Sequence, residues 1–223
     1  MSLTRGFIDG EYQDGELRGL NFLVGRRGYG KTTEMARLLS LCTGGVLFFD
    51  TLSKHAPVLP GYVIIAEPGP LLEYLRVNRG RRFRVLYQPR QGSLDDHFKT
   101  VCKIVRAVGW MIFAVDEVDK LCGARHGSSW MPVEFYDLVN YGRHCRVSMI
   151  ATARRPQGVA AGFKAESELR VFRLKDGAAL KSIEDEIGAE NLPRVANLPK
   201  YVYLHCIEDE DPVTRGPNHA IAR

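Results

Sequence analysis

A glycine-rich stretch near the N-terminus, VGRRGYGKTT at residues 24–33, limits the possible fold of this chain more than any other segment. It fits the phosphate-binding pattern G-x-x-x-x-G-K-[ST] through Gly25, Gly30, Lys31 and Thr32. The apolar run LNFLV precedes it and a segment with helical spacing follows. Glycines let backbone N–H groups converge on an anion at the start of a helix. The stretch therefore predicts a strand, a phosphate-binding loop and a helix in direct succession.

The loop predicts a nucleotide as ligand, with Mg²⁺ beside it. In such a loop Lys31 holds the β- and γ-phosphates, and the Thr32 hydroxyl coordinates the metal ion. The residues that we assign to nucleotide binding are Gly25, Gly28, Tyr29, Gly30, Lys31, Thr32 and Thr33. Arg26, Arg27 and Tyr29 occupy variable positions of the motif, so contact with the nucleotide, with a neighbouring subunit or with solvent alone stays open for each.

Short apolar and β-branched runs recur along the whole chain and alternate with segments of helical spacing. The runs span 20–24, 45–50, 62–66, 83–87, 110–115, 146–152, 169–174 and 201–206. This alternation predicts an α/β fold with a mainly parallel central sheet. Together with the phosphate-binding loop, it resembles a P-loop NTPase of the RecA/ASCE-like type. Continuous apolar runs are typical of central strands, so we expect helices on both faces.

Length and composition bound the domain organisation. With 223 residues and 45% hydrophobic content, the chain can bury one substantial core. We expect a single P-loop ATPase domain at 1–206 and a polar tail or arm at 207–223, where Pro212 and Pro217 interrupt regular structure.

The cysteines and the hydropathy pattern bear on the compartment. The five cysteines are scattered without C-x-x-C or C-x-x-H spacing, which favours neither a zinc site nor a disulfide framework and indicates a reducing, cytoplasmic environment. The N-terminus has no apolar signal region, and no stretch approaches the roughly 18 apolar residues that span a bilayer. We therefore expect no membrane span.

The positive charge of the chain is compatible with a polyanionic partner. The net charge is +5 and the isoelectric point about 9.0. Part of this charge is concentrated in the run RVNRGRRFRV, which contains Arg76, Arg79, Arg81, Arg82 and Arg84. Such a run is either a solvated face or a contact with a nucleic-acid backbone.

The run WMIFAVDEVDK bears on hydrolysis. A very apolar strand ends here in Asp116 and Glu117, at the edge where parallel α/β sheets place their ligands. There Asp116 can hold Mg²⁺ opposite Thr32, and Glu117 can orient and polarise the attacking water. We expect Asp119 on the surface. The acid pair favours an ATPase over a small-molecule kinase, and the lack of an N-K-x-D tetrapeptide argues against a GTPase.

A further strand, 146–152, supplies two more candidates. Its last residue, Thr152, would lie beside Asp116 if the two strands are neighbours, where its hydroxyl could sense the γ-phosphate or position water. An ordinary threonine at a strand end is the alternative. Arg143 precedes the strand, at the end far from the subunit's own phosphates. It is either a surface residue or, in a ring, an arginine that enters the next subunit's site and stabilises transition-state charge.

The order VGRRGYGKTT, FFD, WMIFAVDE and GRHCRVSMIATARRPQ resembles the FtsK–HerA superfamily of DNA-pumping ATPases, which includes small packaging ATPases of internal-membrane viruses. Gly142 and Arg143 match a G-R pair whose arginine acts in trans in that superfamily, and Thr152 with Arg155 and Pro156 matches its T-Q-R-P-like end of a strand. The chain departs from this pattern at Ala153, which replaces the sensor glutamine, and by the additional Arg154.

Two further segments allow two interpretations each. Asp50 closes the run VLFFD and matches an aspartate of the superfamily, but it also suits a helix cap or a turn. The glycine- and serine-rich segment 123–129, with Arg125 and His126, reads as a loop that faces either the pore of a ring or plain solvent.

The resemblance implies an Mg²⁺-dependent ATPase that moves double-stranded DNA without sequence preference, as a homo-oligomeric ring of five or six subunits. The chain length favours a viral genome-packaging motor among these proteins. Its further partners would be capsid or vertex proteins, and its location the host cytoplasm or the virion vertex. The alternatives are a zonula-occludens-toxin-like ATPase of phage assembly and a nucleotide-dependent scaffold that moves nothing. Within this interpretation Lys31, Glu117, Arg143 and Thr152 are the catalytic residues, and Thr32 and Asp116 the metal ligands.

Overall fold

A large sheet dominates the computed structural model, which describes residues 5–8, 11–53, 59–122, 130–207 and 210–216. Its strands are β4 (Leu20–Val24), β5 (Gly45–Phe49), β6 (Val63–Ile65), β7 (Phe83–Tyr87), β8 (Met111–Val115), β9 (Val147–Ala153), β10 (Ser167–Phe172), β11 (Tyr203–Cys206) and β12 (Val213–Arg215). The strands β4 to β11 correspond to the predicted runs. The apolar patterning therefore located the strands of the central sheet to within about two residues.

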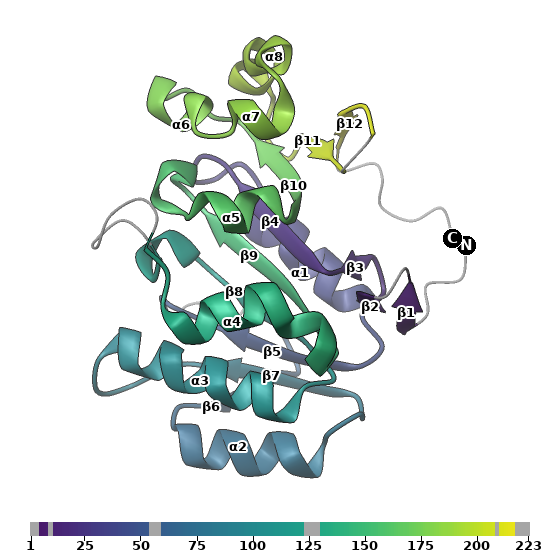
Figure 1. Ribbon diagram of the computed structural model, residues 1–223, viewed down its shortest axis with the longest axis vertical. Helices are drawn as coiled ribbons and strands as arrows, with labels where there is room; N and C mark the ends of the chain where they lie inside the picture. The colour runs from purple at the N-terminus through teal and green to yellow at the C-terminus, as the bar shows by residue number, and fades with distance from the viewer. Residues whose placement is uncertain (1–4, 9–10, 54–58, 123–129, 208–209, 217–223) are drawn as a thin grey trace.

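The strand order of this sheet is β12-β11-β10-β4-β9-β8-β5-β7-β6 (Figure 1). All neighbours from β10 to β6 run parallel, whereas β11 and β12 are antiparallel. The predicted α/β fold with a mainly parallel sheet is confirmed. Because β9 lies between β4 and β8, the end of β9 separates the phosphate-binding loop from the acid pair.

The N-terminal residues add a small second sheet that the sequence reading did not include. It consists of β1 (Gly6–Ile8), β2 (Glu11–Asp14) and β3 (Leu17–Arg18), in antiparallel order. At the other end of the chain, β12 lies in the stretch predicted as a tail or arm and pairs with β11. The division at residue 206 itself stays a prediction.

Helices cover both faces of the large sheet, as predicted. They are α1 (Lys31–Leu41), α2 (Pro68–Val77), α3 (Leu94–Val108), α4 (Val133–Tyr141), α5 (Ala161–Ala165), α6 (Gly177–Lys181), α7 (Glu184–Ile187) and α8 (Leu192–Asn197). Figure 1 shows α3, α4 and α5 in front of the sheet and α1 behind it, with α6 to α8 together at one end.

Two buried clusters form the core, one on each face of the sheet. Successive residues of a strand point to opposite faces, so Phe22 and Val24 of β4 join the cluster under α2 to α5, whereas Leu23 joins the cluster under α1. The buried residues Met35, Leu38 and Leu39 pack α1 on this second face. The helix that starts at the phosphate-binding loop is thereby held against the strand that precedes the loop.

The arginine run beginning at Arg76 divides into two sets. The guanidinium of Arg84 donates to the carbonyls of Gly44 and Cys42, and Arg79 Nε donates to the Val108 carbonyl at 2.8 Å. Arg76, Arg81 and Arg82 are exposed. Part of this run therefore binds the chain's own backbone, and Arg79 does so although the residue is exposed.

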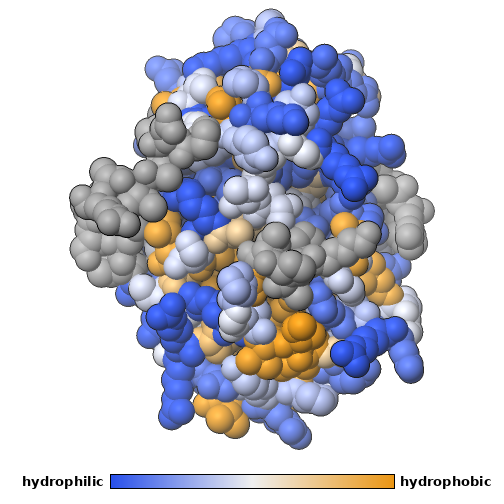
Figure 2. All heavy atoms as spheres, turned by 180° about the vertical axis from the view of Figure 1, so that it is seen from behind, coloured by the Kyte–Doolittle hydropathy of each residue, from blue (hydrophilic) through white to orange (hydrophobic). Residues whose placement is uncertain are grey.

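An apolar surface lies at the end of the molecule that carries α2 and β6. Val63 and Ile64 of this edge strand are 45% and 48% exposed. Figure 2 shows apolar side chains gathered low on the face opposite to the view of Figure 1. None of the helices in the described part of the chain has the length and apolarity that crossing a membrane requires. The segment 123–129, with Arg125 and His126, for which a loop was predicted, lies outside the described residues.

Candidate active site

The phosphate-binding loop connects β4 directly to α1, and its glycines are required by close packing. Gly30 caps α1 with a φ of 107°, and a Cβ there would lie 2.8 Å from the ring of Tyr201. Gly25 has a φ of 151°, and its Cβ would lie 2.6 Å from the Cβ of Phe172. A side chain at either position would meet strain and a clash together, so the loop keeps bare backbone where it turns.

Lys31, the first residue of α1, points back into the loop. Its Nζ donates to the carbonyl oxygens of Gly25 at 2.6 Å and Arg26 at 3.2 Å, and the residue is only 8% exposed. Burial lowers the pKa of Lys31 to about 8, although the negative charge of Asp116 partly opposes this. The ammonium group is thus held where a phosphate would meet it.

The acid pair follows the end of β8. Asp116 and Glu117 are 4% and 5% exposed, so both carboxylates lie in a largely dry setting. Glu117 adopts a left-handed conformation with φ 50° and ψ 50°, which costs of the order of 1–3 kcal/mol for a residue with a side chain. Strain of this kind persists where the surrounding structure imposes it, and here it turns the chain sharply after β8.

Thr152 of β9 links the two acids. The strands β8 and β9 are neighbours, which was the condition for this contact in the sequence analysis. Thr152 Oγ1 donates to Asp116 Oδ1 at 2.5 Å and accepts the backbone N–H of Glu117 at 3.0 Å. Thr152 is fully buried. One hydroxyl therefore fixes both the carboxylate of Asp116 and the strained backbone of Glu117.

Two cations contact the carboxylate of Glu117. Arg154 forms an ion pair with Glu117 Oε1, and Lys120 Nζ lies 2.5 Å from Oε2. Ala153, the last residue of β9, is fully buried. Beyond Thr152, it is therefore Arg154 whose side chain reaches the acid pair.

These groups surround a hollow of about 370 Å³ at the carboxyl edge of the sheet. The predicted residues that line it are Gly28, Gly30, Lys31, Thr32, Thr33, Asp116, Glu117 and Thr152. Four further residues line it that we did not assign to the site from sequence, namely Arg27, Leu52, Arg154 and Tyr201. Tyr201 carries no motif, and it reaches the loop because its backbone N–H bonds to the Tyr29 carbonyl at 3.0 Å.

Gly25 and Tyr29 do not line the hollow. The Gly25 carbonyl accepts the bond from Lys31, so this residue shapes the loop from behind. The ring of Tyr29 lies 5.7 Å from the guanidinium of Arg173, and its hydroxyl lies 3.4 Å from Arg173 Nη1. The side chain of Tyr29 thus packs toward β10 instead of the hollow.

The structure contradicts the prediction for Asp119 and agrees with one of the two interpretations of Asp50. Asp119, expected on the surface, is half-buried, and burial raises its pKa although backbone N–H groups of Arg154 and Arg155 oppose this. It lies in the short turn Val118–Lys120, directly after the acid pair. Asp50 is fully buried and accepts the backbone N–H of Leu52 at 3.1 Å, which agrees with the turn-forming interpretation.

Arg143 lies away from this hollow. It is exposed in the short turn Gly142–Cys145 before β9, whereas Thr152 is near the other end of that strand. A strand of seven residues spans about 20 Å. Arg143 lines a separate hollow of about 250 Å³ together with Glu168 and other residues at the amino edge of the sheet.

The oxygen ligands that Mg²⁺ prefers are present in the site. The Thr32 hydroxyl and the Asp116 carboxylate line the same hollow, and Mg²⁺ is commonly held by one or two such groups together with substrate phosphates. Within the described ranges no cluster of three or more His, Cys, Asp or Glu side chains forms an all-protein metal site. The donor set therefore fits Mg²⁺ bound jointly with a nucleotide.

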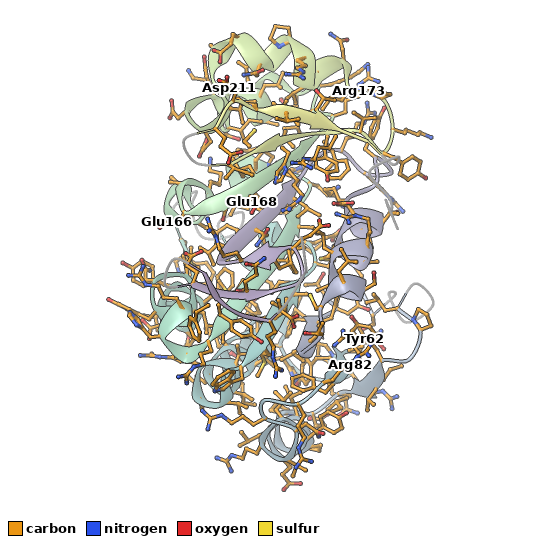
Figure 3. The ribbon with its side chains drawn as sticks, turned by 90° about the vertical axis from the view of Figure 1, so that its right-hand side faces the viewer. Tyr62, Arg82, Glu166, Glu168, Arg173 and Asp211 are labelled. Atoms are coloured by element: carbon orange, nitrogen blue, oxygen red, sulfur yellow. The ribbon has the colours of Figure 1, made fainter. Side chains whose placement is uncertain are left out.

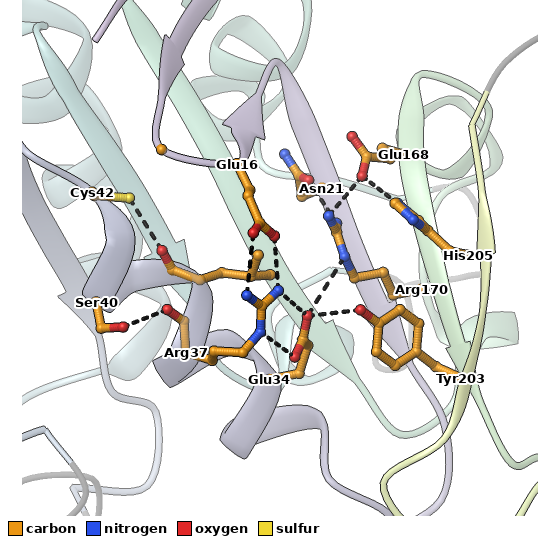
Figure 4. A network of polar contacts seen from close by, with 12 residues as sticks. Glu16, Asn21, Glu34, Arg37, Ser40, Cys42, Glu168, Arg170, Tyr203 and His205 are labelled. Atoms are coloured by element: carbon orange, nitrogen blue, oxygen red, sulfur yellow. Dashed lines mark hydrogen bonds and ion pairs between the residues drawn. The ribbon is translucent and has the colours of Figure 1, made fainter. Parts of the chain in front are cut away.

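A polar network anchors the helix that follows the loop (Figure 4). Glu34, in the first turn of α1, accepts bonds from Arg37 at 2.8 Å and from the Tyr203 hydroxyl at 2.9 Å. The nearly buried Arg170 lies 4.0 Å from Glu34 and 2.7 Å from Glu168. The start of α1 is thereby tied to β10 and β11.

Glu168 is the far end of this network. Burial alone would raise its pKa, but a hydrogen bond from His205 and the charge of Arg170 outweigh burial, so the pKa of Glu168 is lowered. His205 Nε2 lies 2.5 Å from Glu168 Oε1. Glu168 also lines the hollow that contains Arg143, so the network reaches from the phosphate-binding helix to the opposite edge of the sheet.

Comparison with known proteins gives structural neighbours only. No family model and no curated protein sequence matches the chain. The genome-packaging NTPase B204 of Sulfolobus turreted icosahedral virus 2, solved in complex with AMPPCP, superposes with a TM-score of 0.70 at 16% identity, over 89% of this chain and 97% of that one. The DNA-packaging ATPase B204 of Sulfolobus turreted icosahedral virus superposes with a TM-score of 0.67 at 15% identity, with the same coverage.

A third neighbour is more distant. The N-terminal domain of zonular occludens toxin from Neisseria meningitidis gives a TM-score of 0.44 at 16% identity, over 69% of this chain and 76% of that one. At these identities the likeness concerns the fold. The chain has the fold of P-loop NTPases, and among solved structures it resembles the viral genome-packaging NTPases, as the order of its motifs predicted.

Proposed function

We propose that the protein is an Mg²⁺-dependent ATPase that moves double-stranded DNA as a homo-oligomeric ring, in the manner of a viral genome-packaging motor. The observation that carries this proposal is the convergence of Lys31, Thr32, Asp116, Glu117 and Thr152 on one hollow. A phosphate-binding loop alone supports nucleotide binding. An acid pair buried beside it adds the means to activate water.

Each residue has a separate part in the proposed reaction. Lys31 and the loop N–H groups bind the phosphates, and Thr32 and Asp116 hold Mg²⁺, which neutralises developing charge when bound. Glu117 accepts a proton from the attacking water or orients it. Thr152 holds both acids in place through its hydroxyl.

The proposed ring supplies the positive charge that stabilises the transition state. Arg143 lies at the amino edge of the sheet, about a strand's length from its own subunit's hollow. In a ring it acts on the nucleotide of the next subunit, as a finger in trans. The site is then complete only between two copies of the chain.

DNA as cargo is supported by the structural likeness to packaging NTPases and by the net charge of +5. A motor has to grip every sequence, so it reads phosphates through arginines and lysines instead of base edges. Under this proposal the further partners are capsid or vertex proteins, and the location is the host cytoplasm or the virion vertex. The single domain expected at 1–206 is the motor unit.

The test is ATP turnover with and without duplex DNA of unrelated sequences. We expect stimulation that is independent of sequence and that weakens steeply as salt rises from about 50 to 200 mM. The Lys31→Ala variant, which loses the phosphate contact, serves as the inactive control. Equal turnover with and without DNA at low salt would favour the scaffold interpretation, and stimulation by a membrane-inserted phage assembly complex alone would favour the toxin-like one.

A further inference from the structure

A strongly cationic hollow lies directly beside the hollow lined by Lys31, Thr32 and Asp116, which we call the nucleotide hollow. The volume of the cationic hollow is about 450 Å³, and its cations are Arg26, Arg27, Arg154, Arg155 and Lys175. Asp176 is the acid among the described lining residues. The two hollows share Arg27 and Arg154. Within the described part of the chain, Arg26, Arg155 and Lys175 are exposed and form no ion pair.

An acidic hollow lies at the amino end of β10. Its volume is about 770 Å³, and its acids are Asp185, Glu186, Glu190, Glu210 and Asp211. Lys164, the cation among the described lining residues, is already engaged with the Ser182 carbonyl and lies 3.8 Å from Glu186. The acids therefore leave a net negative surface.

This acidic hollow is continuous with the one that contains Arg143. The two share Ala165, Ser167 and Ile207. Glu166, which is exposed, adds a further negative charge beside Arg143, and Arg18, the other cation that lines this hollow, lies 3.6 Å from Glu11. The arginine expected to act in trans therefore projects from an acidic surface.

The cationic and acidic surfaces cannot meet within one subunit. Ser167 at the start of β10 lines the acidic hollow, and Lys175, shortly after the end of β10, lines the cationic one. The six residues of β10 span about 17 Å, and Lys175 lies three residues beyond the last of them. In Figure 3, Glu166 and Asp211 lie on one side of the upper half of the molecule and Arg173, which follows β10, on the other.

We propose that the acidic surface of one subunit docks on the cationic hollow of the next subunit. The contact is heterologous, so repeated copies close into a ring if the rotation permits. The acidic surface borders Arg143, and the cationic hollow borders the nucleotide hollow. Docking therefore brings Arg143 of one copy beside the nucleotide hollow of its neighbour. Complementary charge of this kind selects the register of a contact and speeds encounter.

This inference rests on the proposed function only for the role of Arg143; the docking itself concerns charge and shape. Charge reversal tests it directly. Arg155→Glu with Lys175→Glu reverses the cationic side, and Asp185→Lys with Asp211→Lys reverses the acidic side. Association of the full-length chain is measured by sedimentation at low salt with an ATP analogue and without DNA.

We expect each reversed pair to weaken self-association at least tenfold. We expect the chain with all four changes to recover association to within a few-fold of wild type, because its surfaces are complementary again. The matched control is Arg81→Glu with Arg82→Glu, two adjacent exposed arginines, which should leave association unchanged. Figure 3 shows Arg82 in the lower half of the molecule, away from Glu166, Asp211 and Arg173. Binding of a fluorescent ATP analogue should stay within about threefold in all variants, since each subunit's own loop is intact.

Three results would overturn the docking proposal. They are unchanged association in both reversed pairs, failure of the four-change chain to recover, and a wild type that stays monomeric at high concentration. If Arg155→Glu with Lys175→Glu weakened DNA binding but left self-association unchanged, the cationic hollow would be assigned to DNA binding instead. ATP hydrolysis by a strictly monomeric wild type would leave ATP hydrolysis as the activity, but it would remove this interface, the proposed ring and the role of Arg143 in trans.

Discussion

Arg154 forms an ion pair with Glu117, joining the residue after the end of β9 to the acid after the end of β8. The pair lies at the wall of the nucleotide hollow, because both residues line it. An ion pair to the proposed base fixes where that carboxylate points. Arg154 is therefore a positioning residue for Glu117 in addition to any contact with the nucleotide.

For Arg154→Ala we expect ATP turnover to fall about tenfold, since the Glu117 carboxylate loses the guanidinium that holds it. If the effect passes through Glu117, the double variant with Glu117→Gln should be no slower than Glu117→Gln alone. Arg82→Ala, which removes an exposed arginine far from the site, should leave basal turnover unchanged. Additive losses in the double variant would show that Arg154 acts independently of Glu117.

Lys31→Ala and Glu117→Gln should separate binding from chemistry. Lys31 contacts phosphates in the ground state, so its loss should weaken nucleotide binding; Glu117 acts on water, so its amide variant should bind ATP normally but lose about 100-fold or more in turnover. Equilibrium binding and single-turnover hydrolysis measure the two steps. Turnover of Glu117→Gln at the wild-type rate would contradict the assignment of the base.

Nucleotide affinity should depend on pH through Lys31. Burial lowers the pKa of Lys31 from 10.5 to about 8, so the cation that attracts phosphate is fully present below this pH and is lost above it. We expect the affinity for ATP to fall between pH 7 and 9.5, approaching about tenfold per pH unit at the upper end. Lys31→Ala should bind weakly with no such slope. A flat wild-type profile over this range would be inconsistent with a titrating Lys31.

Thr152→Val should damage both stability and turnover, because valine keeps the shape but removes the hydroxyl that bonds Asp116 and the Glu117 N–H. We expect a loss of about 1–3 kcal/mol in the free energy of unfolding, measured with denaturant, and slower hydrolysis. Thr152→Ser keeps the hydroxyl and should retain most of both. Equal behaviour of the serine and valine variants would mean that the bridge has no role.

Arg143→Ala should abolish most hydrolysis while ATP binding stays intact, since an arginine finger is typically worth about a thousandfold or more. Inactive Arg143→Ala subunits mixed with inactive Glu117→Gln subunits should regain activity, because some interfaces then pair an intact arginine with an intact base. Mixed rings are verified by native mass measurement. No recovery in verified mixed rings would point to an arginine of the subunit's own site, such as Arg154 or Arg155.

The sequence by itself determined the strands and the phosphate-binding loop. Apolar runs such as 20–24 and 83–87 match β4 and β7. A strand that is buried on both faces of a sheet needs continuous apolar residues, whichever strands lie beside it. Local spacing was enough to assign Lys31, Thr32, Asp116 and Glu117 to the candidate site, since a loop at the start of a helix and an acid at the end of a strand are local features. The additional sheet β1–β3 and the strand β12 carried no comparable signal, being short and only partly apolar.

Only the tertiary structure decided which side chains meet at the hollow. The order of strands places β9 between β4 and β8, and this alone brings Thr152 to Asp116 and Arg154 to Glu117. Asp119 became half-buried, and Tyr201 reached the loop from more than 160 residues away in sequence, through contacts that no local pattern encodes. Spacing along a chain fixes which residues share an element, but strand order and the packing of distant segments fix which elements share a site, and those depend on the free energy of the whole core.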